Sequence, residues 1–245
     1  MNCKNCGHIV EGKYCNHCGQ KTNVGKITFS SLLNELTESI FQIDRGFFYT
    51  LLQLFKRPGK SIKEYLNGKR KRYFKPIAYL ITFSTIFFII SKMIGQNTWL
   101  DDLITGFAKG GSNKEEITEV LNWIAQNYAY ATLMLIPVFS LASFISFWGT
   151  GKNYIEHLVI NSYVTGQQAI LYSIFAILKK FIGGEIFDLL PVVIAVSYAI
   201  IVFWQIFEKG NRMKVLLRSL LTYVLYLILG LAILIVILGI TEITK

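Results

Sequence analysis

The four cysteines of this 245-residue chain all lie within its first eighteen residues, as two Cys-x-x-Cys pairs. Each pair places two thiolates on one tight turn, and a glycine follows each pair directly, which suits the positive-φ corner of a metal-binding knuckle. Eight residues separate the pairs, enough for a short hairpin that gathers four sulfurs around one tetrahedral ion. The predicted metal ligands are Cys3, Cys6, Cys15 and Cys18.

Zinc suits these ligands best, because it takes four sulfurs at about 2.3 Å without redox chemistry. A closed shell of four cysteines leaves no position for a substrate, so one structural Zn²⁺ is predicted. An iron–sulfur or redox dithiol role and a disulfide are the alternatives. The N-terminus shows no apolar signal segment, and a reducing cytosol disfavours the disulfide. His8 and His17 flank the ligands, either as substitute ligands or as exposed loop residues.

A second candidate constellation is Glu156, His157 and Asn161, at the start of a predicted membrane span. A His-x-x-x-Asn pair binds metal in some intramembrane proteases together with paired glutamates, but the Glu-Glu pair here falls in a predicted outer loop. These residues are therefore weak catalytic candidates, with helix-end hydrogen bonding and ligand or proton handling as alternatives. Further along the same span, Gln167 and Gln168 either line a polar pathway or hydrogen-bond between helices.

The composition indicates that membrane helices position these residues. Hydrophobic residues make up 53% and charged residues 16% of the chain, against about 25% charged residues in soluble domains. Five segments approach the roughly 20 apolar residues that a span requires. The predicted fold is an all-α integral membrane bundle of about five transmembrane helices behind an N-terminal zinc ribbon or knuckle hairpin. The ribbon covers 1–22, membrane-surface helices cover 26–75, and the membrane domain covers 76–245, with spans at 76–95, 128–149, 158–178, 186–207 and 219–240.

Residues 26–75 combine amphipathic helical patterns with a strongly basic run. A helix over about 46–56 is expected to end at Arg57-Pro58-Gly59, and these helices either lie at the membrane surface or pack on the bundle. Nine cations against Glu64 give the run a net charge of +8, suited to anionic lipid and to setting topology. Nucleic acid is disfavoured because no base-reading element accompanies the charge. The cations are Lys56, Arg57, Lys60, Lys63, Lys69, Arg70, Lys71, Arg72 and Lys75.

Loop charge predicts the orientation of the bundle. The loop 96–127 has a net charge of −3 and the loop 208–218 a net charge of +3, while the run before the first span is at +8. The positive-inside rule therefore places the N-terminus in the cytosol, and five crossings place the C-terminus outside.

Residues 1–80 resemble a family of uncharacterised bacterial membrane proteins. In that family a zinc ribbon precedes the motifs T-x-x-x-L-x-x-R-P-G and Y-x-x-G-x-R-x-x-Y-x-x-P and several spans. The resemblance implies an architecture at the bacterial inner membrane, and no activity is established for the family. The five-span plan is also similar, at the level of fold alone, to the Yip family of trafficking proteins. The matching residues are Thr50, Leu54, Arg57, Pro58, Gly59, Tyr65, Gly68, Arg70, Tyr73 and Pro76.

Three function classes follow from these features. The first is a non-enzymatic scaffold or interaction protein whose ribbon docks a protein partner while the basic run contacts anionic lipids of the bilayer. The second is a small-solute transporter or channel that uses the polar third span. The third is an intramembrane hydrolase. A homo-oligomer is compatible with each of them.

Overall fold

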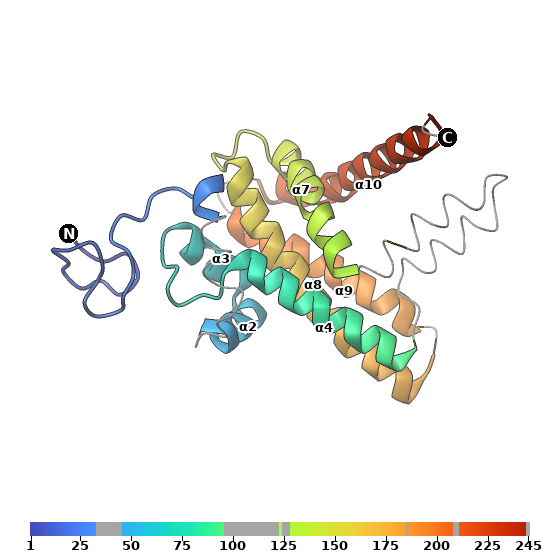
Figure 1. Ribbon diagram of the computed structural model, residues 1–245, viewed down its shortest axis with the longest axis horizontal. Coiled ribbons are helices and arrows are strands. Elements are labelled where there is room, and N and C mark those ends of the chain that lie inside the picture. Colours follow the sequence, from blue (N-terminus) through green and yellow to red (C-terminus); the bar gives the residue numbers. More distant parts are fainter. Residues whose placement is uncertain (33–45, 96–122, 124–127, 185, 208–210, 244–245) are drawn as a thin grey trace.

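The computed structural model describes residues 1–32, 46–95, 123, 128–184, 186–207 and 211–243 (Figure 1). Within these ranges the chain is helical and forms no β-strand, and its N-terminal module is a pair of turns with isolated bridges. The named helices are α2 (Gly46–Lys56), α3 (Pro58–Leu66), α4 (Pro76–Ile94), α7 (Tyr128–Ser146), α8 (Tyr154–Ile182), α9 (Ile186–Ile206) and α10 (Arg212–Ile243).

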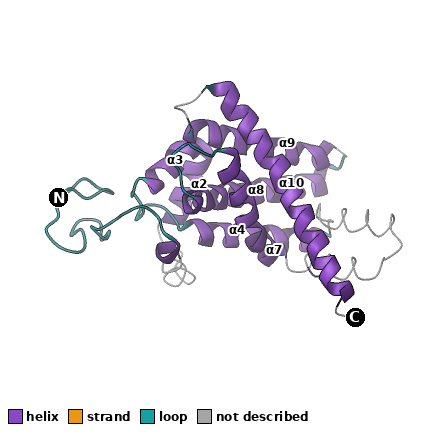
Figure 2. Ribbon diagram, turned by 90° about the horizontal axis from the view of Figure 1, so that it is seen from above, coloured by secondary structure: helices purple, strands orange, loops and turns teal. Residues whose placement is uncertain are grey.

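Helix α8 is the central element of the bundle (Figures 1 and 2). It packs on α4, α7 and α9, most extensively on α4, and α10 packs on α7 and α9. Gly166 permits the close approach of α8 to α4, because a Cβ atom there would lie 2.6 Å from Cδ1 of Tyr79. Small residues at such crossings are typical of membrane helices, which lack a hydrophobic driving force between them.

Among the described residues, three helical segments are long and apolar enough to cross a membrane, namely Pro76–Ile94, Ile186–Ile206 and Arg212–Ile233. A shorter apolar segment, Thr132–Ser146, lies within α7. Large apolar side chains remain exposed along these helices, such as Leu227 of α10 at 63% exposure. Exposed apolar surface of this extent suits lipid and not water, so the helices indicate a membrane protein.

Each of the five predicted spans lies largely within a helix, but in the described part of the chain only three of these helices, α4, α9 and α10, are long and apolar enough to cross a membrane. The third predicted span, in α8, also differs in its bounds. Helix α8 begins four residues before the predicted span 158–178 and continues to Ile182. Its polar first half is buried, and His157, Asn161 and Gln167 have no exposed surface at all. These polar side chains face neighbouring helices, which explains how a helix of modest hydropathy sits at the centre of an apolar bundle.

The helices α2 and α3 pack on the bundle, which was one of the two arrangements open from the sequence. Leu54, Ile62 and Tyr65 are almost fully buried, and α3 contacts α9. The outer face of α2 nevertheless stays apolar and exposed, at Phe48 and Leu52. The segment 33–45 of the predicted surface helices lies outside the described residues, as does the predicted outer loop apart from position 123.

Candidate metal centre and the basic segment that carries it

The two Cys-x-x-Cys pairs fold into two equivalent knuckles. The Gly7 amide donates to the Cys3 carbonyl at 2.9 Å, and the Gly19 amide donates to the Cys15 carbonyl at 2.8 Å. Both glycines have positive φ, +81° and +69°, which is the corner expected from the sequence. Short bridges between flanking residues close each turn.

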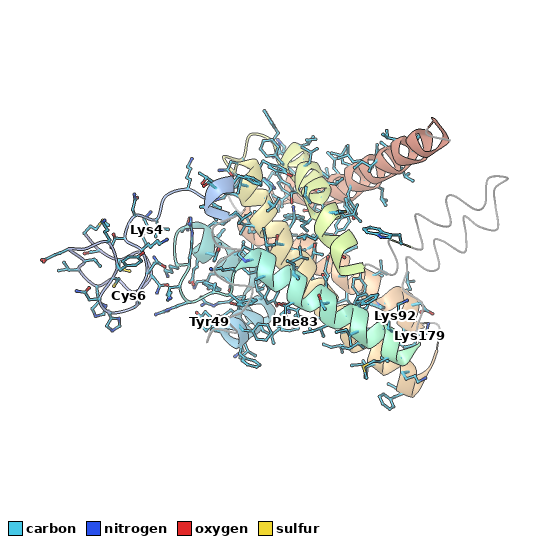
Figure 3. All side chains as sticks on the ribbon, viewed as in Figure 1. Lys4, Cys6, Tyr49, Phe83, Lys92 and Lys179 are labelled. Atoms are coloured by element: carbon cyan, nitrogen blue, oxygen red, sulfur yellow. The ribbon has the colours of Figure 1, made fainter. Side chains whose placement is uncertain are left out.

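The knuckles bring all four thiols together, and none of the cysteines is in a disulfide. The Sγ atoms of Cys3 and Cys18 are 3.6 Å apart, those of Cys6 and Cys15 are 3.5 Å apart, and all four lie within 4.8 Å of one another. A tetrahedron of sulfurs at about 2.3 Å from a central ion has edges of about 3.8 Å. The four cysteines therefore fit one tetrahedral metal ion, as predicted, and Figure 3 shows the Cys6 side chain within this module.

The local backbone favours the thiolate form of Cys3 and Cys15, whereas for Cys6 the hydrogen bond from the His8 amide is outweighed by burial and the neighbouring thiols, which raise its pKa to about 12. A hydrogen bond from the Cys6 amide lowers the pKa of Cys3 to about 6, and the Cys18 amide likewise lowers the pKa of Cys15. The rings of His8 and His17 stack beside the thiols with centroids 3.8 Å apart. Both are exposed and, together with Cys6, could form a second ligand set, so both interpretations of these histidines remain.

Gln20, directly after the second knuckle, joins the ribbon to the basic run. Its side-chain Nε2 donates to the Gly68 carbonyl at 2.9 Å, and its Oε1 accepts from the amides of Arg70 and Lys71 at 3.0 and 3.1 Å. The side chain is 5% exposed. All three bonds are made to backbone groups of the basic run. Backbone groups do not depend on residue type, so the sequence shows no sign of this contact and Gln20 was not predicted as a functional residue.

A second set of contacts fastens the ribbon to the same loop. Lys4 Nζ donates to the Val24 carbonyl at 2.6 Å, and its aliphatic chain lies over Gly68, where a Cβ would come within 2.9 Å of Lys4 Cδ. Gly68 has a φ of +104°, so it is required by conformation as well as by space. Arg70 Nη2 donates to the Gly25 carbonyl at 2.8 Å. The ribbon is thus held on the loop that leads into α4.

The basic run contains an internal ion network around Glu64. Arg57 Nη1 donates to Glu64 Oε1 at 3.2 Å, and the Tyr73 hydroxyl donates to Glu64 Oε2 at 2.7 Å. Lys69 Nζ lies 3.7 Å from Glu64 Oε1. Burial opposes ionisation of Glu64, but the Tyr73 hydrogen bond and the charge of Arg57 outweigh it and lower its pKa. Arg57 and Lys69 therefore serve the fold in addition to any contact with lipid.

Two further close contacts place α2 and α3. The Thr50 hydroxyl accepts from the Phe74 amide at 2.7 Å, which ties α2 to the loop before α4. The Gly59 amide donates to Gln205 Oε1 of α9 at 2.8 Å, and a Cβ at Gly59 would lie 2.2 Å from the Gln205 Cβ. Pro58 is the first residue of α3, so it begins a helix as well as following the end of α2. Proline fits this position because the N–H groups of the first helical turn have no acceptor within the helix, and no hydrogen bond is lost.

Residues 44–88 match the model of a family described as "Protein of unknown function (DUF3667)". The match covers α2, α3 and the first part of α4, and it contains all ten residues of the two motifs. No curated protein and no solved structure matches the chain. Within the matched segment, the motif residues have structural roles: Thr50, Gly59 and Gly68 set close contacts, while Arg57 and Tyr73 bind Glu64.

The second constellation is only partly assembled. His157 Nδ1 lies 2.9 Å from Ser143 Oγ of α7, and Asn161 Nδ2 donates to the same Oγ at 2.7 Å. Glu156 does not join them, because its carboxylate accepts from the Asn153 amide in a capping box and pairs with a lysine one turn earlier. The geometry fits the hydrogen-bonding alternative for His157 and Asn161.

The two glutamines of α8 bond to different neighbours. Gln167 Oε1 accepts from the Tyr79 hydroxyl of α4. Gln168 Nε2 donates to the Ala195 carbonyl of α9 at 2.9 Å and to the Tyr223 hydroxyl at 3.3 Å. Both make interhelical bonds, and Gln168 also lines a cavity of about 180 Å³ within the bundle.

Proposed function

We propose that this protein is a non-enzymatic docking protein of the bacterial cytoplasmic membrane, with five spans, a cytosolic N-terminus and a C-terminus outside. The ribbon carries one structural Zn²⁺ and presents a fixed surface to a cytosolic protein partner. The observation that carries the proposal is the set of three hydrogen bonds between the Gln20 side chain and the backbone of Gly68, Arg70 and Lys71. These bonds, termed the Gln20 joint, hold the ribbon on the bundle in one orientation. A module that only stores metal does not need a fixed orientation. A recognition surface benefits from one, because less ordering is then required when the partner binds.

The free surface of the ribbon has the character of a recognition site. Ile9 is 80% exposed and Tyr14 is 54% exposed, although each lies in a knuckle with almost no apolar core. The stacked rings of His8 and His17 are also exposed. Exposed aromatic and apolar side chains on a rigid support are typical anchors of protein interfaces. A closed four-cysteine shell adds stability without an open coordination position.

The neighbouring part of the molecule suits the membrane surface. Phe48, Leu52 and Phe55 form the exposed apolar face of α2, and Lys56 and Lys60 follow at its end. An apolar face beside lysines fits the headgroup boundary of an anionic bilayer. This arrangement supports a ribbon held close to the cytosolic leaflet.

Site-specific crosslinking tests the docking role in native membranes. A photoreactive residue at Tyr14 should capture one defined cytosolic protein, and Ile9→Ser or Cys15→Ser should abolish that crosslink. Phe48→Ser is the matched control, because it removes another large exposed apolar side chain, 65% exposed, away from the ribbon. Loss of the crosslink in Phe48→Ser as well, or capture that survives Cys15→Ser, would contradict the proposal.

Reporter fusions test the orientation separately. Fusions at position 110 should report outside, and fusions at position 212 should report the cytosol, because the loops differ in charge sign. The opposite result at either position would overturn the five-span arrangement.

One observation favours the transporter or channel as a second candidate. The 180 Å³ cavity lies among α4, α7, α8, α9 and α10, and polar groups of Ser84, Gln168 and Tyr223 line it. Reconstituted protein that moves a small solute, with flux abolished by Gln168→Leu and retained after removal of residues 1–22, would establish this candidate and exclude the first. No comparable contact favours an intramembrane hydrolase, since Glu156 is turned away from His157 among the described residues.

A further inference from the structure

A cavity of about 690 Å³ opens at the end of the bundle beside α3. Its lining comes from α3, the turn between α7 and α8, the end of α9 and the start of α10. Four cations line it, and no carboxylate does among the described residues. They are Lys63, Lys152, Lys214 and Arg218.

The four cations come from three separate segments. Lys63 lies on α3, and Lys152 lies in the turn before α8. Lys214 and Arg218 are one turn apart on α10. Lys152 also pairs with Glu156 at 3.0 Å, but Glu156 does not line the cavity, so the lining itself is positively charged. Cations that converge on one space without a lining carboxylate favour an anionic occupant.

The cavity also has an apolar part, beside the polar side chains of Asn67, Thr150 and Asn211. Phe147, Ile206, Phe207 and Val215 line it, each no more than 8% exposed. The volume lies within the roughly 300–1,000 Å³ of small-molecule sites. Beyond Arg218, one helical turn further along α10, the exposed Leu221 continues the apolar surface along the helix. The site therefore combines cations with apolar side chains, and an exposed apolar residue lies one turn beyond it on α10.

We propose that this cavity binds a phosphate group carried on an apolar tail, as in an anionic phospholipid. Arginine and lysine are the side chains that hold phosphate in proteins, Arg218 as a planar fork and the lysines as point charges. The apolar lining and the exposed face of α10 accommodate the start of the tail. A free phosphate shares the same chemistry, and the tail is what distinguishes the lipid. The site is separate from the ribbon surface and from the exposed face of α2.

Lipid retention by the full chain in nanodiscs tests the site. The probe is dioctanoyl phosphatidylglycerol, added to protein in a zwitterionic bilayer and counted by native mass spectrometry. The double substitution Lys214→Gln with Arg218→Gln should weaken retention at least about tenfold, because two charge-assisted contacts are lost. Lys13→Gln with Lys21→Gln is the control, since it removes two exposed cations of the same chain outside both the cavity and the basic run. That control pair should change retention less than twofold.

Several outcomes would overturn the assignment. Equal loss in both pairs would mean diffuse surface attraction, and no loss in the cavity pair would exclude the site. Full displacement of the lipid by an equal concentration of inorganic phosphate would show that the tail contributes nothing. A second substitution, Val215→Asp, places a carboxylate in the lining and should abolish retention. An unchanged thermal unfolding midpoint in this variant and in the cavity pair is the check on folding.

Discussion

The Gln20 joint makes a quantitative prediction for Gln20→Leu. Leucine keeps most of the side-chain volume and removes both polar atoms, so the Gly68 carbonyl and the amides of Arg70 and Lys71 lose their partner. A partly buried backbone group without a partner costs about 1–3 kcal/mol, and access of water to this loop favours the lower end. At about 1 kcal/mol for each of the three bonds, docking of the ribbon weakens by about 3 kcal/mol, or roughly 100-fold.

Hydrogen exchange measures this effect directly. In Gln20→Leu, the amides of Arg70 and Lys71 should exchange much faster while α8 keeps its protection, because the change is confined to the joint. Zinc content should stay at one ion per chain, since Gln20 is not among the ligands. Lys21→Gln is the control, as Lys21 is exposed and adjacent. Unchanged exchange at Arg70 and Lys71 would refute the joint, and loss of zinc would show that Gln20 serves the metal site instead.

Three further predictions concern the fold and the metal. Gly59→Ala should destabilise the protein by about 2–3 kcal/mol through the clash with Gln205, and combining it with Gln205→Gly should cost less than the two single effects summed, in reversible unfolding assays. Because the folded pKa of Glu64 is lowered from 4.5, its stabilisation is present above pH 4.5 and lost as pH falls through the folded pKa. Glu64→Gln should therefore lower stability by about 1–2 kcal/mol at pH 7, and this difference should vanish in acid. Cys15→Ser should abolish stoichiometric zinc in metal analysis and unfold the ribbon alone, leaving the helical circular dichroism signal unchanged.

Local patterns in the sequence determined the four-cysteine cluster and most of the helices. The cysteine spacing and the glycines after each pair act within a few residues, so the knuckle geometry follows from them. Apolar runs of about 20 residues likewise predicted the helices that begin at Pro76 and Ile186, since burial in lipid is a property of the segment itself. A proline in the motif was harder to interpret, because Pro58 is compatible with both the end of one helix and the start of the next.

Only the tertiary structure decided how these parts are joined. Gln20 and Gln205 each recognise backbone groups far away in the chain, at Gly68 and at Gly59, and backbone carries no sequence signal. The cationic cavity also depends on packing. Its basic residues come from α3, the turn before α8 and α10, and in the sequence each of these segments is an ordinary basic loop or helix end. Short-range chemistry is therefore encoded by residue types and spacing, whereas the docking of the ribbon and the cavity depend on long-range packing of the helices.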